Sequence, residues 1–197
     1  ETTEGVHIHI IDAELMGKGE KEKKDLYIEG VQNNGIINHY EYIINSEGTI
    51  EIRHVLKPEG KMPLWFPRIG LTLTVSDALD QVKWYGRGPQ ENYPDRKTGY
   101  PTRIYASTVQ AMYEPYLMPQ DYGLRTDVRW LQLTTDKGIG LQFKMNEWFN
   151  FNIYPYSTDN LTKAMYTYQL QKQKGMTLNL DYATTGVLSL IHISEPT

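Results

Sequence analysis

Short segments in which apolar and polar residues alternate cover much of this 197-residue chain. Alternation with a period of about two residues is typical of β-strands, because successive side chains point to opposite faces of a sheet. In the segment VHIHI, Val6, Ile8 and Ile10 fall on one face, and His7 and His9 fall on the other. The pattern predicts a chain made mainly of strands that bury one face.

Turn signals between these segments predict two β-hairpins. The first joins residues 42–45 to residues 50–55 through Ser46-Glu47-Gly48, and the second spans residues 130–143 with a turn at Asp136-Lys137-Gly138. Glycine that follows polar residues favours tight turns of this kind. Two further strands are expected at residues 69–75 and 177–182.

The chain offers one clear helix signal. Residues 157–165, STDNLTKAM, place Ser157 in the N-cap position and Asp159 in the first turn. Many closely spaced strands with at most one or two short helices predict an all-β fold, in the form of an antiparallel sandwich or barrel. Neither a linker nor a shift in composition marks a boundary, so residues 1–187 are expected to form one domain.

The composition excludes several kinds of partner and site. Without cysteine the chain has no disulfide and no thiolate ligand, and the bacterial cytoplasm and periplasm both remain open as compartments. The balance of 20 basic and 24 acidic residues, a net charge of −4, argues against nucleic acid and anionic membranes as partners. No apolar run reaches the roughly 18 residues of a membrane helix, and the N-terminus shows no signal-peptide pattern. The charged run at residues 17–25 is expected to be a solvated hairpin tip.

Residues 84–96, WYGRGPQENYPDR, form the densest polar segment. Its glycines and prolines force an irregular loop after a strand that ends near Tyr85. Polar groups packed into such a loop either satisfy one another, with Arg96 pairing with Glu91 or Asp95, or bind a ligand. The sequence leaves both interpretations open. The candidates for shaping this loop or lining a substrate cleft are Arg87, Glu91, Asn92, Tyr93, Asp95 and Arg96.

Glu91 and Asp95 also suggest the paired carboxylates of a glycosidase, which lie roughly 5 Å apart across the scissile bond in retaining enzymes. The neighbouring Arg87 and Arg96 instead favour two salt-bridged anions, whereas an acid catalyst needs a raised pKa. Direct catalysis by this pair is therefore not expected, and no catalytic residue is assigned to the chain.

A second polar segment, residues 116–131, places Arg125, Asp127 and Arg129 on one face of a strand and Trp130 on the other. An alternating ladder of this kind is typical of a structural ion network, and it equally suits one wall of a cleft. The two histidines of VHIHI share a strand face, as metal ligands can. No third ligand is indicated near them, so no metal site is expected.

Both polar segments resemble one known family. WYGRGPQENYPDR is similar to the signature Trp-aromatic-Gly-x-Gly-Pro-x-Glu-Asn-Tyr-x-Asp-Arg of the small-chain domain of β-galactosidases in glycoside hydrolase family 2. YEPYLMPQDYGLRTDVRWL resembles the next motif of that domain, and LNLDYATTGV resembles the segment that follows. Order and spacing agree, so the resemblance covers roughly residues 6–187.

The resemblance implies a galactose-mutarotase-like supersandwich, which is a large antiparallel β-fold of two layers. It implies a parent enzyme that hydrolyses terminal β-galactosides with retention, forms a homo-oligomer and uses Mg²⁺ and Na⁺. In that family both catalytic glutamates and most metal ligands lie on a separate TIM barrel. This chain is therefore expected to bind no cofactor, to have the barrel and the other domains as partners, and to meet the galactoside only within the complete enzyme.

The sequence departs from the family after Val187. The family continues with a Gly-Gly-Asp-x-Ser-Trp motif whose tryptophan completes the sugar-binding cleft, whereas this chain reads LSLIHISEPT. The fold is therefore expected to be truncated at its C-terminus, and residues 188–197 are interpreted as a tail foreign to the family or as a diverged strand. Two other functions stay open, namely a free-standing carbohydrate-binding or mutarotase-like protein and a purely structural or oligomerisation module.

Overall fold

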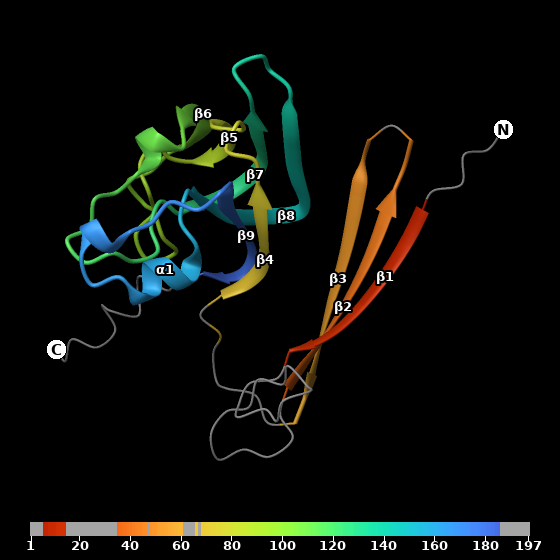
Figure 1. Cartoon of the computed structure of the whole chain (residues 1–197). Coiled ribbons are helices and arrows are strands. Elements are labelled where there is room, and N and C mark those ends of the chain that lie inside the picture. The colour runs from red at the N-terminus through yellow and green to blue at the C-terminus, as the bar shows by residue number, and fades with distance from the viewer. Residues whose placement is uncertain (1–5, 15–34, 47, 61–65, 67, 186–197) are drawn as a thin grey trace. The chain divides into compact units, whose positions relative to one another are not determined.

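The computed structural model describes residues 6–14, 35–46, 48–60, 66 and 68–185. The chain divides into two compact units, Glu1–Trp65 and Phe66–Thr197. Antiparallel β-sheet dominates both units (Figure 1). The all-β antiparallel class expected from the sequence is therefore confirmed.

The first unit contains a three-stranded antiparallel sheet in the order β1-β2-β3, with β1 (Val6–Glu14), β2 (Gly35–Ile44) and β3 (Ile50–Glu59). The first expected hairpin is present as β2 and β3. Asn45 closes its turn, because the Asn45 side-chain oxygen accepts a hydrogen bond from the Thr49 amide at 2.9 Å.

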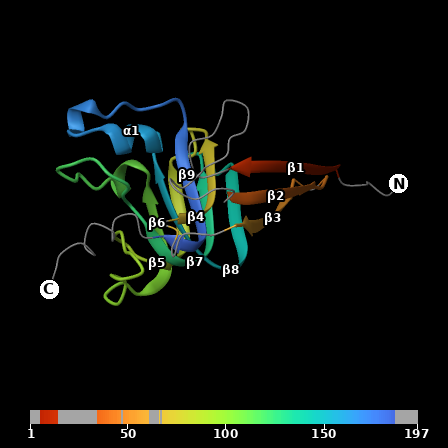
Figure 2. The same ribbon diagram turned by 90° about the horizontal axis from the view of Figure 1, so that it is seen from below.

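The second unit is built on a six-stranded antiparallel sheet in the order β4-β9-β8-β7-β5-β6 (Figures 1 and 2). The strands are β4 (Arg68–Val75), β5 (Gln81–Arg87), β6 (Thr102–Thr108), β7 (Arg125–Thr134), β8 (Gly140–Tyr154) and β9 (Met176–Thr185). The second expected hairpin joins β7 to β8. Its turn contains Gly138 at a φ of +79°, a conformation that favours glycine. The strands expected at 69–75 and 177–182 are present as β4 and β9.

The helices of the second unit are short and lie in the connections between strands. They are the 3₁₀ turns η1 (Gln110–Met112) and η2 (Thr167–Gln169) and the helix α1 (Thr158–Lys163). Ser157 caps α1 as expected, because its hydroxyl accepts a hydrogen bond from the Asn160 amide at 3.1 Å. In the part of the chain that the structure describes, no helix has the length and apolar character needed to cross a bilayer.

Alternating side chains of the six-stranded sheet form the main core. In β5, Val82 and Trp84 are buried, whereas Lys83 and Tyr85 between and after them are exposed. The Trp84 indole meets the Phe151 ring edge-on, with 5.9 Å between the ring centroids. Burial of such large apolar surfaces on one face is the main force that holds the sheet together.

The last part of β8 is buried on both faces. Phe151 belongs to the main core, whereas Asn152 and Tyr154 are fully buried in another environment. Tyr154 packs there with Tyr122, from the connection before β7, and with Leu161 of α1. This second cluster fixes the connection between β6 and β7 against the sheet. The same connection contains residues that form hydrogen bonds with the loop between β5 and β6.

Some expectations concern residues outside those described. The charged segment 17–25, the tail at 188–197 and the side chains of His7 and His9 belong to this group. The single domain expected over residues 1–187 stays a prediction.

Replacement of Ser157 tests the account of the start of α1. S157A removes the acceptor of the Asn160 amide, and we expect the free energy of unfolding to fall by about 1 kcal/mol. S157D keeps a capping oxygen and is the matched control, with little expected loss. Urea denaturation followed by circular dichroism measures the difference, and an equal loss in both variants would contradict the account.

Candidate functional site

The polar loop, defined here as residues 88–101, connects β5 to β6. A Cβ atom added to Gly88 would lie 2.9 Å from the Tyr105 ring and 3.0 Å from the Trp84 ring, so the loop begins at a point that requires glycine. Further along, Tyr93 and Arg96 form an antiparallel bridge, in which the Arg96 amide donates to the Tyr93 carbonyl at 2.8 Å. The loop therefore follows a tight, hydrogen-bonded path.

Glu91 is the most heavily bonded side chain of the loop and is only 5% exposed. One carboxylate oxygen accepts hydrogen bonds from the Tyr93 hydroxyl at 3.1 Å and the Gly123 amide at 2.9 Å. The other accepts from the Arg96 guanidinium at 3.0 Å and from the Tyr116 hydroxyl. The pairing of Arg96 with Glu91 that the sequence suggested is thus present, and Glu91 holds the loop together rather than pointing at solvent.

The two tyrosines that bond Glu91 are held in their neutral form. Burial, together with the charge of Glu91, raises the pKa of Tyr93. Burial and the hydrogen bond to Glu91 likewise raise the pKa of Tyr116. Both phenols therefore act as hydrogen-bond donors around neutral pH and not as bases.

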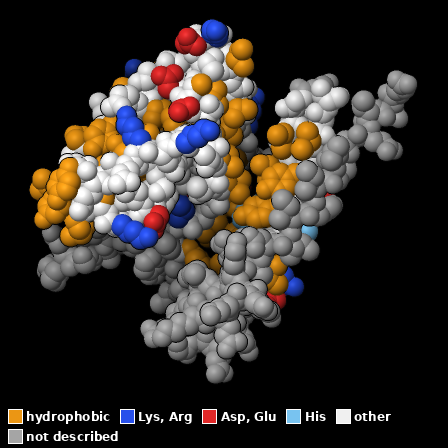
Figure 3. Space-filling view, viewed as in Figure 1, with side chains coloured by type: hydrophobic (Ala, Val, Ile, Leu, Met, Phe, Trp, Pro, Cys, Tyr) orange, Lys and Arg blue, Asp and Glu red, His pale blue; other side chains and the backbone are white. Residues whose placement is uncertain are grey.

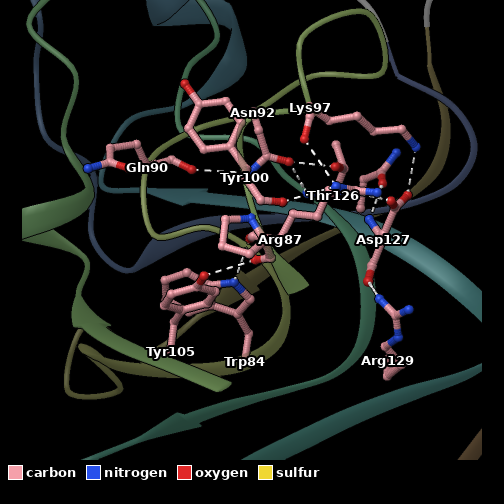
Figure 4. Close-up of polar contacts among 12 residues, drawn as sticks. Trp84, Arg87, Gln90, Asn92, Lys97, Tyr100, Tyr105, Thr126, Asp127 and Arg129 are labelled. Atoms are coloured by element: carbon pink, nitrogen blue, oxygen red, sulfur yellow. Dashed lines mark hydrogen bonds and ion pairs between the residues drawn. The ribbon is translucent and has the colours of Figure 1, made fainter. Parts of the chain in front are cut away.

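Asn92 attaches the same part of the loop to the start of β7 (Figure 4). Its side-chain oxygen accepts hydrogen bonds from the backbone amide and the hydroxyl of Thr126, and its backbone amide donates to the Leu124 carbonyl at 2.8 Å. Asn92 is fully buried. Because all of these groups are buried, each needs its partner, and the loop and the start of β7 stabilise each other.

Asp127 makes a second attachment, at the two ends of the loop (Figure 4). Its carboxylate accepts from the Arg87 guanidinium at 2.5 Å and from the Lys97 ammonium at 2.9 Å. Arg87 also donates to the carbonyl oxygens of Lys97 and Tyr100, each at 3.0 Å. Burial opposes the charged form of Asp127, but the hydrogen bonds from Arg87 and Lys97 outweigh burial and lower its pKa.

Arg125 is a buried cation beside this cluster. It is 3% exposed, stacks over the Trp84 ring at 5.5 Å and donates to the Gly123 carbonyl at 2.8 Å. Burial lowers the pKa of Arg125 to about 10, although the charge of Glu91 opposes this shift. The side chain remains charged at neutral pH and is directed into the protein.

Arg129 lies on the opposite side of the sheet from Arg125. Its guanidinium stacks over Tyr85 at 5.3 Å and over Trp148 at 4.0 Å. Hydrophobic side chains remain at the surface of the second unit (Figure 3), and Trp148 is 60% exposed. Arg129 thus belongs to an aromatic surface cluster.

The expected ladder of Arg125, Asp127 and Arg129 on one strand face is wrong. Arg125 contacts Trp84 and Arg129 contacts Tyr85, and these neighbours point to opposite faces of β5. The physical reason is irregularity in β7, where the pairing with β8 shifts register on both sides of Val128 and Asp127 has a φ of +54°. A bulge of this kind breaks the period of two on which the expectation rested. Trp130 also lies beside Tyr85, with 6.5 Å between the ring centroids, so it shares the face of Arg129.

Asp95 differs from Glu91, the other acidic residue of the loop, because it is exposed. Glu91, in contrast, is turned inward toward four donors. The two carboxylates therefore do not form the facing pair that a retaining glycosidase requires. Among the residues that the structure describes, no group of three or more histidine or carboxylate side chains is arranged to hold a metal ion.

A partly buried network next to the site was not expected from the sequence. Asp121 accepts hydrogen bonds from Arg68 at 2.9 Å, Asn152 at 2.9 Å and Tyr154 at 3.0 Å. Asn179 donates to Asn152 at 2.8 Å and so extends the network to β9. The available signal was the alternation in NFNIY and TLNLDY, which places polar residues at every second position of strands otherwise rich in large apolar residues.

Comparison with known proteins adds an independent observation. The sequence profile of the family described as "Beta galactosidase small chain" matches residues 5–189. The chain is 38% identical over 146 residues to a β-galactosidase of Priestia megaterium, and the aligned region covers 74% of this chain and 14% of that protein. It is 38% identical over 121 residues to a β-galactosidase of Vibrio cholerae, covering 61% of this chain and 11% of that protein. A β-galactosidase of Psychromonas ingrahamii is 33% identical over 153 residues, or 77% of this chain and 14% of that protein. The chain thus spans a small fraction of the length of these relatives.

Replacement of Glu91 tests whether its carboxylate holds the loop. E91Q leaves the shape nearly unchanged but removes the charge that Arg96 and the two tyrosines contact, and we expect the free energy of unfolding to fall by about 2 kcal/mol. D95N removes a charge from the exposed part of the same loop and should change stability by less than about 0.5 kcal/mol. Urea denaturation compares the two, and similar values for both would contradict the role given to Glu91.

The lowered pKa of Asp127 predicts a dependence of stability on pH. A carboxyl whose pKa is lower in the folded state stabilises that state above its ordinary pKa of 3.8 and loses this effect as pH falls through the lowered value. We expect the difference in unfolding free energy between wild type and D127N to be constant at about pH 5–7 and to shrink below about pH 4. Denaturation curves at several pH values measure it, and a difference that grows toward acid pH would have the wrong sign.

Proposed function

Because the chain belongs to the β-galactosidase small-chain family, we propose that it is an accessory domain of a β-galactosidase that forms part of the wall of the active-site cleft. The observation that carries the proposal is the family match over residues 5–189, which includes both polar segments. In this proposal the complete enzyme hydrolyses terminal β-D-galactosides. The acid–base and nucleophilic glutamates come from another part of that enzyme.

The geometry of the polar loop supports a role in shaping a cleft. Glu91, Asn92 and Asp127 direct their polar groups inward and fix the backbone, whereas Asp95 and Arg96 lie at the exposed edge. A binding wall works best when supporting contacts fix its shape in advance. The exposed edge of the loop is then the part that meets the substrate or the barrel.

The length of the relatives supports the assignment of partners. The matching region covers 14% of the Priestia megaterium protein, so most of that protein lies outside the match. We assign the catalytic barrel and any Mg²⁺ or Na⁺ sites to such further domains. We also propose that the complete protein is a homo-oligomer.

A chimeric enzyme tests the proposal directly. The segment of the Priestia megaterium β-galactosidase that matches this chain is replaced by the corresponding 146 residues of the chain, and hydrolysis of a nitrophenyl β-galactoside is measured. We expect the chimera to be active and the isolated chain to be inactive. E91Q in the chimera should raise KM more than it lowers kcat, because it loosens the wall and leaves the catalytic groups in place.

Three results would contradict the proposal in different ways. A folded but inactive chimera would show that this chain cannot complete the cleft. Hydrolysis of lactose by the isolated chain would place the catalytic groups within it. Faster interconversion of galactose anomers by the isolated chain than by buffer, measured by NMR, would favour the alternative of a free-standing mutarotase-like protein.

A further inference from the structure

We propose that Asp127 is a positioning residue that fixes the ends of the polar loop, independently of the attachment at Glu91 and Asn92. The relevance of this inference to a substrate cleft rests on the proposed function. The order of the loop can nevertheless be measured in the isolated chain, whether or not that function is correct.

The contacts of Asp127 join two segments that lie ten positions apart in the sequence. One carboxylate oxygen binds Arg87, at the end of β5, and the other binds Lys97, near the end of the loop. Arg87 closes the ring by donating to the carbonyls of Lys97 and Tyr100. Loss of the carboxylate therefore removes the ion-pair partner of Lys97 and one of the hydrogen-bond acceptors of Arg87.

The backbone of β7 is shaped to bring this carboxylate to the loop. Asp127 has a φ of +54°, which L-residues other than asparagine and aspartate rarely adopt. The Asp127 amide donates to the side-chain oxygen of Asn150 at 3.2 Å, and Arg129 donates to the Asp127 carbonyl. Arg129 in turn stacks on Tyr85 and Trp148. The bulge is thus held by side chains of β5, β7 and β8 in addition to its contacts with the loop.

The attachments at Glu91 and Asn92 act on a different part of the loop. Their hydrogen bonds fix residues 91–93 to the connection before β7 and to the start of β7. The contacts of Asp127 fix residues 97–100. Because the two sets share no atoms, the inference predicts that loss of Asp127 frees one part of the loop and leaves the other ordered.

The positive φ of Asp127 determines which substitutions at this position are suitable as matched variants. D127N removes the charge and keeps a side chain that tolerates a positive φ. D127G removes the side chain and relieves the backbone, so it separates the loss of the contacts from any strain at the bulge. K97Q leaves the bulge unchanged and removes one of the two ion pairs.

Hydrogen–deuterium exchange of the purified chain measures the effect by segment. We expect D127N and D127G to speed amide exchange in residues 97–100 about ten-fold or more, while residues 91–93 and β9 stay at wild-type rates. The amide of Tyr100 is the sharpest reporter, because it donates to the Lys97 carbonyl at 3.1 Å. K97Q should give a smaller increase in the same segment. High salt should speed exchange of residues 97–100 in wild type and have little effect in D127N, because it screens the ion pair of Asp127 with the half-buried Lys97.

Two outcomes would overturn the inference. One is exchange in residues 97–100 that is unchanged in all three variants. The other is an equal increase in residues 97–100, residues 91–93 and β9, because that would show general destabilisation and no specific positioning.

The chimeric enzyme separates this inference from the proposed function. If D127N loosens residues 97–100 in the chain and raises KM more than it lowers kcat in the chimera, both are supported. If it loosens the segment but leaves both kinetic constants unchanged, the positioning role stands and the cleft-wall assignment of this loop fails.

Discussion

The attachment of the polar loop around residues 91–96 depends on one buried charge, the carboxylate of Glu91. A buried carboxylate is costly unless hydrogen bonds replace the water it loses. Here the donors come from the loop itself, through Tyr93 and Arg96, and from the connection before β7, through Tyr116 and Gly123. Neither segment can satisfy the carboxylate alone, so the two must fold against each other.

Elements set by local sequence could be predicted well. Strand positions follow from alternation, and the turn at Gly138 and the N-cap at Ser157 follow from residues a few positions apart. The ion pair of Arg96 with Glu91 is also local, because it spans five positions. In each case the physical cause lies within one short segment, so the sequence alone contains the necessary information.

Features that depend on pairing between distant segments could not be predicted. Asp127 departs from strand geometry where β7 shifts register against β8, and nothing within DVRW indicates that bulge. The hydrogen bonds of Asp121 with Arg68 and Asn152 span 53 and 31 positions. The alternation of NFNIY shows that Asn152 is on a strand, but only the fold shows that both faces of that strand are covered.

The density of polar residues in a loop is therefore a poor guide to chemistry in this protein. Most of the candidates direct their charges inward: Glu91 to its four donors, Arg125 over Trp84, and Asp127 to Arg87 and Lys97. A group with all of its partners within the protein contributes shape, because displacing it would leave buried charges unpaired. Such a segment can give a larger enzyme a surface whose backbone is fixed before substrate arrives. A fixed surface of this kind requires many polar contacts beneath it and few at its exposed edge.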